Sequence, residues 1–236
     1  MSLFKPDGVC TRLQSLLREY HSFSKVMLFG SRARGDCTET SDYDLAVWAE
    51  DESQSGAFLA ALEELPTLHS FDVVFIRPRH LGTALYDSIL GEGVVLMDKF
   101  AHKLGNFRQA LGRLREGIAD AMQTGNLTMR DGAIQRFEFT AELAWKTARE
   151  YLLQQQVQDI NNPKAVMREA WKNKLIADEA GWLQLLQDRN ITSHIYDERM
   201  QMQFSGGCGS GISACWRSWQ RSCRIRRGTQ ESKICT

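Results

Sequence analysis

The chain has 236 residues, of which 43% are hydrophobic and 25% are charged, so it suits one large or two small globular domains. Its formal net charge of zero at pH 7 excludes a protein that holds nucleic acid through overall positive charge, although a local basic face is compatible with it. No apolar run approaches the length of a membrane span, the first residues lack a signal-peptide pattern, and the cysteines of the main body are isolated, so we expect a cytoplasmic protein without a membrane partner.

Up to about Asp98 the chain alternates short apolar runs, which are typical of strands, with helical patterns. We expect strands at 25–29, 42–48, 71–76 and 94–97, and helices at 12–20, 58–65 and 80–90. The alternation predicts a small mixed sheet with helices packed on it, in an α+β domain over residues 1–99.

A glycine-rich turn with the sequence GSRARGD begins at Gly30, directly after the first expected strand. Gly30 lets the main chain approach a ligand closely, and the Ser31 hydroxyl and the N–H groups that open the next helix can hold triphosphate oxygens. Arg32 and Arg34 can meet phosphate charge; alternatively they form a surface pair, or Arg34 pairs with Asp36 and stiffens the loop. The turn predicts nucleotide binding by Gly30, Ser31 and Arg34, with a structural role for Asp36.

Three carboxylates follow the turn. Asp42 and Asp44 are two residues apart on an expected strand, a spacing that points both side chains to one face. Carboxylates held side by side repel each other unless a divalent cation lies between them, and Mg²⁺ is the natural choice. Asp72, which opens another expected strand, completes a triad for a two-metal site if the strands are neighbours. The alternatives are solvated residues at a strand edge and, for Asp72, a capping role.

Together these residues resemble the signature of the DNA polymerase β nucleotidyltransferase superfamily, in its minimal nucleotidyltransferase branch. The matched motifs are Gly-Ser at 30–31, Arg-Gly-Asp at 34–36 and Ser-Asp-Tyr-Asp at 41–44. The resemblance implies a polymerase-β-like fold that uses ATP and Mg²⁺, with Asp42, Asp44 and Asp72 as its metal-binding and catalytic residues.

From Ala101 onward the strand pattern gives way to long amphipathic stretches. We expect helices at 103–122 and 128–156, a third that begins after Asn162-Pro163, and a fourth from near Asp178. These are the elements of an all-α helical bundle over residues 101–204. Its Trp and Phe residues are expected in the core.

A second chemical cluster ends the fourth helix, where residues 188–196 read DRNITSHIY. Arg189 and His194 are close enough on a helix to face one cleft, where a fixed arginine can hold a scissile phosphate and a histidine can act as acid or base without a metal. The alternative is that both side chains cap carbonyl groups at the helix end.

The spacing Arg189-x4-His194-x-Tyr196 is similar to the motif of HEPN domains, and residues 130–161 resemble the nucleotidyltransferase substrate-binding branch of that family. The resemblance implies a toxin–antitoxin pair. The HEPN member is a metal-independent ribonuclease that acts as a homodimer, and its nucleotidyltransferase partner neutralises it by transferring AMP from ATP to the tyrosine. Carried onto this sequence, Tyr196 is the acceptor, in cis or in a sister subunit, and Asp72 helps to deprotonate it.

The segment 205–236 departs from the expected bundle, because a glycine-rich run stands where a final helix is needed and Arg, Ser, Cys and Trp then follow without a period. A zinc or RNA-binding tail is one interpretation, but the cysteine spacing is irregular. Back-translation with a one-base shift can yield an amphipathic helix, so we interpret the tail as frameshifted and expect it to be disordered.

Three functions remain open at this point. The first is a protein adenylyltransferase that acts on Tyr196. The second is a HEPN ribonuclease regulated by the nucleotidyltransferase half, with RNA as its substrate. The third is a small-molecule nucleotidyltransferase of the antibiotic-modifying type, in which the helical half presents the substrate.

Overall fold

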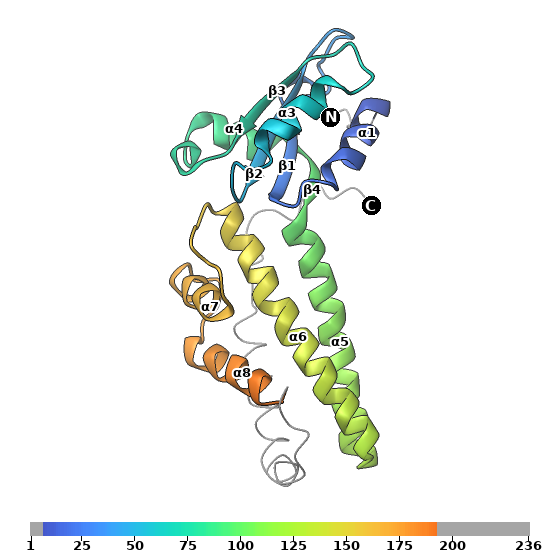
Figure 1. Cartoon of the computed structure of the whole chain (residues 1–236), viewed down its shortest axis with the longest axis vertical. Helices are drawn as coiled ribbons and strands as arrows, with labels where there is room; N and C mark the ends of the chain where they lie inside the picture. Colours follow the sequence, from blue (N-terminus) through green and yellow to red (C-terminus); the bar gives the residue numbers. More distant parts are fainter. Residues whose placement is uncertain (1–6, 193–236) are drawn as a thin grey trace. The chain divides into compact units, whose positions relative to one another are not determined.

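The computed structural model describes residues 7–192, and for residues 191 and 192 it describes the main chain alone (Figure 1). The described chain forms two compact units. The first comprises residues 7–100 together with Leu153–Gln158, and the second comprises Ala101–Leu152 together with residues 159–192. The expected tail therefore lies outside the described residues.

The first unit is built on a four-stranded mixed sheet. Its strands are β1 (Phe23–Phe29), β2 (Tyr43–Ala49), β3 (Phe71–Phe75) and β4 (Val94–Asp98), in the order β3-β2-β1-β4. β1 pairs antiparallel with β2 and β4, whereas β2 and β3 are parallel. The mixed sheet is confirmed. β3, which carries Asp72, lies at the edge of the sheet, where it pairs with β2 and is separated from β1.

Helices cover both faces of this sheet (Figure 1). They are α1 (Gly8–Leu17), α2 (Gly30–Arg34), α3 (Ser55–Glu63), the 3₁₀ turn η1 (Pro78–His80) and α4 (Ala84–Glu92). One core joins α1 and α3 to the sheet and includes Leu13, Phe23 and Phe58, which are fully buried. The opposite face packs Trp48 against Ile89 of α4. Apolar side chains therefore pack on both faces of the sheet, and this packing fixes the positions of the strand ends.

Helix α1 begins four residues earlier than expected and also ends three residues earlier. Its start is set by Asp7, whose Oδ1 accepts a hydrogen bond of 2.8 Å from the Cys10 amide and so caps the helix. Similarly, the helix expected at 80–90 is divided, because the turn at Pro78–His80 precedes α4 and Thr83 caps α4 by accepting from the Tyr86 amide.

The second unit contains α5 (Lys99–Thr124), α6 (Leu127–Gln154), α7 (Pro163–Lys172) and α8 (Glu179–Thr192), although the ends of α5 and α6 fall in the first unit. Asn162 caps α7 by accepting from the Ala165 amide, and Pro163 occupies its first turn, as expected. Phe137 and Trp182 are buried.

The expectation that all Trp and Phe residues of this unit are core is wrong for two of them. Phe139 is 60% exposed and Trp171 is 46% exposed. Phe139 alternates with the buried Phe137 around α6, and a helix cannot turn both toward the same neighbour.

The α+β class, a mixed sheet with helices followed by a helical domain, is confirmed. Within residues 7–192, no helix combines the length and the apolar character that crossing a membrane requires.

Candidate functional site

Two of the three carboxylates lie side by side on the parallel pair of strands. Asp44 is the second residue of β2, Asp72 is the second residue of β3, and the two are register partners. Parallel strands place partners of this kind on the same face of the sheet at neighbouring positions. The fold therefore brings together two carboxylates that are 28 positions apart in sequence, which the prediction for Asp72 required.

Asp42 is not on the strand, contrary to expectation. β2 begins at Tyr43, whose amide donates to the Ser70 carbonyl at 2.9 Å, and Asp42 is the exposed residue just before it. The main chain is diverted from the ladder there because the carbonyls of Ser41 and Asp42 accept hydrogen bonds from Arg32 instead.

The electrostatics of the three carboxylates centre on Asp44. Partial burial raises its pKa, the negative charges of Asp72 and Asp42 raise it further, and the positive charge of Arg34 partly opposes the rise. The fold thus disfavours the ionised form of Asp44. A cation held by all three would remove this repulsion.

The chemistry of this donor set fits Mg²⁺, which takes carboxylate oxygens and completes its shell with water and phosphate. As the side chains lie, no three His, Cys, Asp or Glu residues within 7–192 are gathered as a ready metal-binding group. Binding would therefore require the carboxylates of Asp42, Asp44 and Asp72 to turn toward one another, and the metal triad stays a prediction.

Gly30 lies against Asp44 at the junction between β1 and α2. Its φ is +71°, a conformation that favours glycine. A Cβ built at this position would overlap Oδ2 of Asp44 and stand 3.0 Å from its Cγ. The glycine is therefore required twice, by the turn and by the carboxylate beside it. Ser31 follows at the start of α2, half-buried, and no side chain caps this short helix. The roles of Gly30 and Ser31 in nucleotide binding stay predictions.

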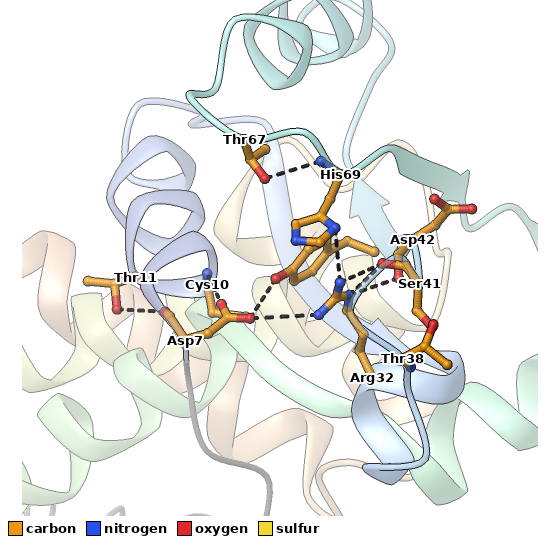
Figure 2. A network of polar contacts seen from close by, with 10 residues as sticks. Asp7, Cys10, Thr11, Arg32, Thr38, Ser41, Asp42, Thr67 and His69 are labelled. Carbon is orange, nitrogen blue, oxygen red and sulfur yellow. Dashed lines mark hydrogen bonds and ion pairs between the residues drawn. The ribbon is translucent and has the colours of Figure 1, made fainter.

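Arg32 is not a surface residue, which corrects the surface-pair alternative. Its side chain is 10% exposed and lies 3.9 Å from the centroid of the Tyr43 ring (Figure 2). Nε donates to the Ser41 carbonyl at 2.9 Å, and Nη2 lies 3.2 Å from Nδ1 of His69. With its donors directed at protein atoms, this guanidinium is a structural group in the described chain.

Behind Arg32 the network reaches the cap of α1. Tyr43 donates its hydroxyl proton to Oδ2 of Asp7 at 2.5 Å, and Nη1 of Arg32 lies 3.9 Å from the same oxygen. Burial and the carboxylate raise the pKa of Tyr43. Burial opposes ionisation of Asp7, but the hydrogen bonds from Tyr43 and Cys10 and the charge of Arg32 outweigh it and lower the Asp7 pKa. Burial and Asp7 also raise the pKa of the Cys10 thiol to about 12, so this cysteine is an unreactive core group.

Asp7, Tyr43 and His69 were not predicted from the sequence as members of this network. The signal for Asp7 was present, because an aspartate ahead of an apolar periodic segment is typical of a helix cap. The contacts of Tyr43 and His69 depend on strand pairing and had no local signal.

Arg34 is exposed and forms two ion pairs, with Oδ2 of Asp36 at 3.2 Å and with Oε2 of Glu92 at 3.1 Å. The first pair supports the structural interpretation of Asp36. Ion pairs this exposed contribute little to stability and are easily exchanged for a ligand, so a nucleotide-binding role for Arg34 is compatible with them and stays a prediction.

In the second unit, Arg189 is near the end of α8 and contacts α6. Its Nη2 lies 3.3 Å from Oε2 of Glu142, which also accepts from Nε1 of Trp145 at 2.9 Å, while Oε1 of Glu142 pairs with Lys146 at 2.9 Å. Burial raises the pKa of Glu142, but these hydrogen bonds and positive charges outweigh it and lower the pKa overall. His194 and Tyr196 lie outside the described residues.

A groove of about 730 Å³ runs between α5 and α6 in the same unit. Its polar lining comes from amides and guanidinium groups, and the exposed Phe139 supplies an aromatic surface. Its lining residues are Asn106, Gln109, Ala110, Arg113, Gly132, Gln135, Arg136, Phe139 and Leu143.

Two known families match consecutive parts of the chain. Residues 11–101 match the family described as polymerase beta nucleotidyltransferase, and residues 102–207 match the family described as nucleotidyltransferase substrate binding protein like. A Haemophilus influenzae protein described as "Probable ribonuclease HepT" is 40% identical over 79 residues, which are 32% of this chain and 54% of that protein. The chain thus spans about half the length of this relative.

Proposed function

Since the chain joins a nucleotidyltransferase domain of the polymerase β family to a HEPN-like domain of the nucleotidyltransferase substrate-binding family, we propose that it is a protein adenylyltransferase dependent on ATP and Mg²⁺. Its acceptor would be Tyr196, in the same chain or in a sister subunit of a homodimer formed through the helical half. The first half would then act as the antitoxin of a fused toxin–antitoxin protein.

The observation that carries this proposal is the register pairing of Asp44 with Asp72. When bound, Mg²⁺ would neutralise triphosphate charge and favour departure of pyrophosphate. Asp42, Asp44 and Asp72 would hold it, and Gly30 leaves the main chain open to the phosphates beside Asp44. The turn between β1 and α2 would supply the backbone approach, and the pairing of β2 with β3 would place Asp44 beside Asp72.

In the proposed step, the phenolic oxygen of Tyr196 forms a bond to the α-phosphorus of ATP. The bond from that phosphorus to pyrophosphate breaks, pyrophosphate leaves with its electron pair, and the phenolic proton passes to Asp72. A phenol has a pKa near 10, so attack at neutral pH needs a base or a metal ion, and Asp72 would act as the base. The product carries added negative charge close in sequence to Arg189 and would hinder RNA from binding there.

The proposal is tested by incubating the purified full chain with ATP and Mg²⁺, followed by intact-mass and peptide mass spectrometry. We expect AMP-sized additions on the Tyr196 peptide, lost in Asp44→Asn and in Tyr196→Phe. Asp87→Asn is the matched control, because Asp87 is an exposed aspartate in the first turn of α4. Undiminished labelling of Asp44→Asn would refute the metal site, and labelling on another residue would refute the acceptor.

The resemblance to the Haemophilus protein favours a second activity, a metal-independent ribonuclease in the helical half. Arg189 would hold the scissile phosphate and His194 would act as acid or base. Cleavage of RNA in EDTA that is lost in Arg189→Ala and in His194→Ala supports this activity, and cleavage that survives both changes excludes it.

The groove between α5 and α6 favours a third activity, in which the helical half presents a small molecule to the nucleotidyltransferase. A groove of this size and mixed polarity suits a compact polar ligand. ATP-dependent modification of an aminoglycoside in the absence of protein labelling would support this activity over the first.

A further inference from the structure

Arg32 belongs to the same glycine-rich turn as the proposed phosphate-binding residues, yet its guanidinium faces the protein. Nε donates to the carbonyl of Ser41 at 2.9 Å and to that of Asp42 at 3.2 Å. Figure 2 shows that the main chain of residues 41–42 faces the guanidinium, whereas the carboxylate of Asp42 points away from it. The Arg32 side chain thus holds the main chain of residues 41–42 and does not engage the Asp42 carboxylate.

The guanidinium is itself fixed from three sides. The centroid of the Tyr43 ring lies 3.9 Å from it, Nη2 lies 3.2 Å from Nδ1 of His69, and Nη1 lies 3.9 Å from Oδ2 of Asp7. For His69 to accept at Nδ1, its ring proton must be on Nε2. A guanidinium with a planar set of donors can serve all these acceptors at once, which an ammonium cannot.

Tyr43 links the two carboxylates of the proposed site. It stands between Asp42 and Asp44 in sequence, its side chain is buried on the Arg32 side, and its hydroxyl is fixed by Asp7. Neighbouring residues of a strand alternate faces, so a Tyr43 fixed on one side directs Asp44 to the other. The contacts of Arg32 therefore determine where the main chain presents Asp42 relative to Asp44.

We propose that Arg32 is a positioning residue that sets the affinity of the carboxylate site for a divalent cation, and that it does not bind the nucleotide. This inference rests on the proposed function, because it takes Asp42, Asp44 and Asp72 as the cation ligands. It assigns Asp7, Tyr43 and His69 to the support of Arg32.

The test measures Mn²⁺ affinity of the full chain by the electron paramagnetic resonance signal of the free ion. Outer-shell groups that hold metal ligands change metal affinity by about 10 to 100-fold when they are removed, and we expect Arg32→Ala to weaken Mn²⁺ binding by that amount. Guanidinium ion at millimolar concentration should restore part of the affinity, because it can refill the space beside Tyr43. Arg12→Ala is the matched control, since Arg12 also donates to a distant carbonyl, that of Pro66 at 2.9 Å.

A second readout separates positioning from phosphate binding. In EDTA, a fluorescent ATP analogue should bind Arg32→Ala and the unaltered chain equally well. Unchanged Mn²⁺ affinity, or a loss of metal-free nucleotide binding, would overturn the proposal. If Arg32→Ala does not fold by circular dichroism, Arg32→Lys decides: weaker Mn²⁺ binding by a folded protein supports the proposal and unchanged binding overturns it. Failure of the unaltered chain to bind Mn²⁺ would instead overturn the proposed metal site itself.

Discussion

Gly30 and Asp44 are in contact across β1 and β2, so closely that a Cβ on the glycine would overlap Oδ2 of the aspartate. The contact joins the glycine-rich turn to the central carboxylate. The backbone proposed to face the phosphates and the side chain proposed to face the cation are therefore placed by the same few atoms, so a change at Gly30 also changes Asp44.

The first prediction is that Gly30→Ala abolishes nucleotide transfer. A Cβ there is strained by the φ of +71° and displaces the Asp44 carboxylate. We expect a loss of activity of about 100-fold or more, with a free energy of unfolding lowered by about 1–3 kcal/mol. Enzyme assay and denaturant unfolding measure the two effects.

Gly56→Ala is the matched control for this change. Gly56 is an exposed residue in α3 with no heavy atom near its Cβ position, so alanine there should leave activity intact and stabilise the helix by about 0.5–1 kcal/mol. Equal activity losses in both variants would show that the Gly30–Asp44 contact is not special.

The second prediction is that Asp44→Asn raises stability while it removes activity. Burial and the charges of Asp72 and Asp42 raise the Asp44 pKa, so ionised Asp44 destabilises the folded state at neutral pH. A neutral side chain of the same shape should stabilise the protein by about 1 kcal/mol, or a few degrees in Tm.

The effect of Asp44 on stability should depend on pH, and its sign follows from the raised pKa. A raised carboxyl pKa means that the folded state binds more protons, so the contribution of Asp44 to stability falls as pH rises from its usual value through the raised one. The difference in Tm between Asp44→Asn and the unaltered chain should therefore vanish below pH 4. A lower Tm for the variant at pH 7 would contradict the prediction.

The third prediction concerns acid stability at Asp7, whose pKa is lowered overall because the hydrogen bonds from Tyr43 and Cys10 and the charge of Arg32 outweigh burial. A lowered carboxyl pKa gives stability that is present above the usual value near 4 and lost as pH falls through the lowered value. Asp7→Ala also removes the cap of α1, so we expect a cost of about 1–3 kcal/mol at pH 7. Thermal unfolding between pH 2 and 7 should show this cost shrinking in acid, and a constant cost would contradict it.

The fourth prediction is that Glu142→Gln destabilises the helical unit by about 1 kcal/mol at pH 7. Glu142 accepts from Trp145 and pairs with Lys146 and Arg189, and the lowered pKa means that this stability is lost as pH falls below its usual value. Glu138→Gln, one turn earlier on α6, is the matched control. Equal effects of both changes on the Tm would refute a specific role of the Glu142 charge.

The sheet domain was largely predictable from sequence because its strands are short apolar runs and its motif residues are adjacent in the chain. Asp72 was predicted as part of the site through strand patterning, and the parallel pairing with β2 supplies the reason. The start of β2 was misplaced by one residue because the Arg32 contacts that divert the chain at Asp42 span ten positions and leave no local pattern.

The helices of the second domain were predicted well, but which of their side chains are buried was predicted less well. Caps such as Asn162 are local and can be read from sequence, but burial depends on which neighbour a helix meets. Trp171 and Phe139 are aromatic at helical spacing and yet exposed, and Glu142 was not predicted as a partner of Arg189 because the two are 47 positions apart.

The segment Leu153–Gln158 belongs to the sheet unit, where Gln154 donates to Asp98 at 2.9 Å, although it follows Ala101–Leu152 in the chain. Because a ribosome makes the chain in order, Asp98 of β4 cannot form its contact with Gln154 until all of Ala101–Leu152 has been synthesised. The sheet unit therefore cannot gain its last native contacts before Ala101–Leu152 of the helical unit has been made, and the order of synthesis couples the completion of the first unit to the synthesis of the second.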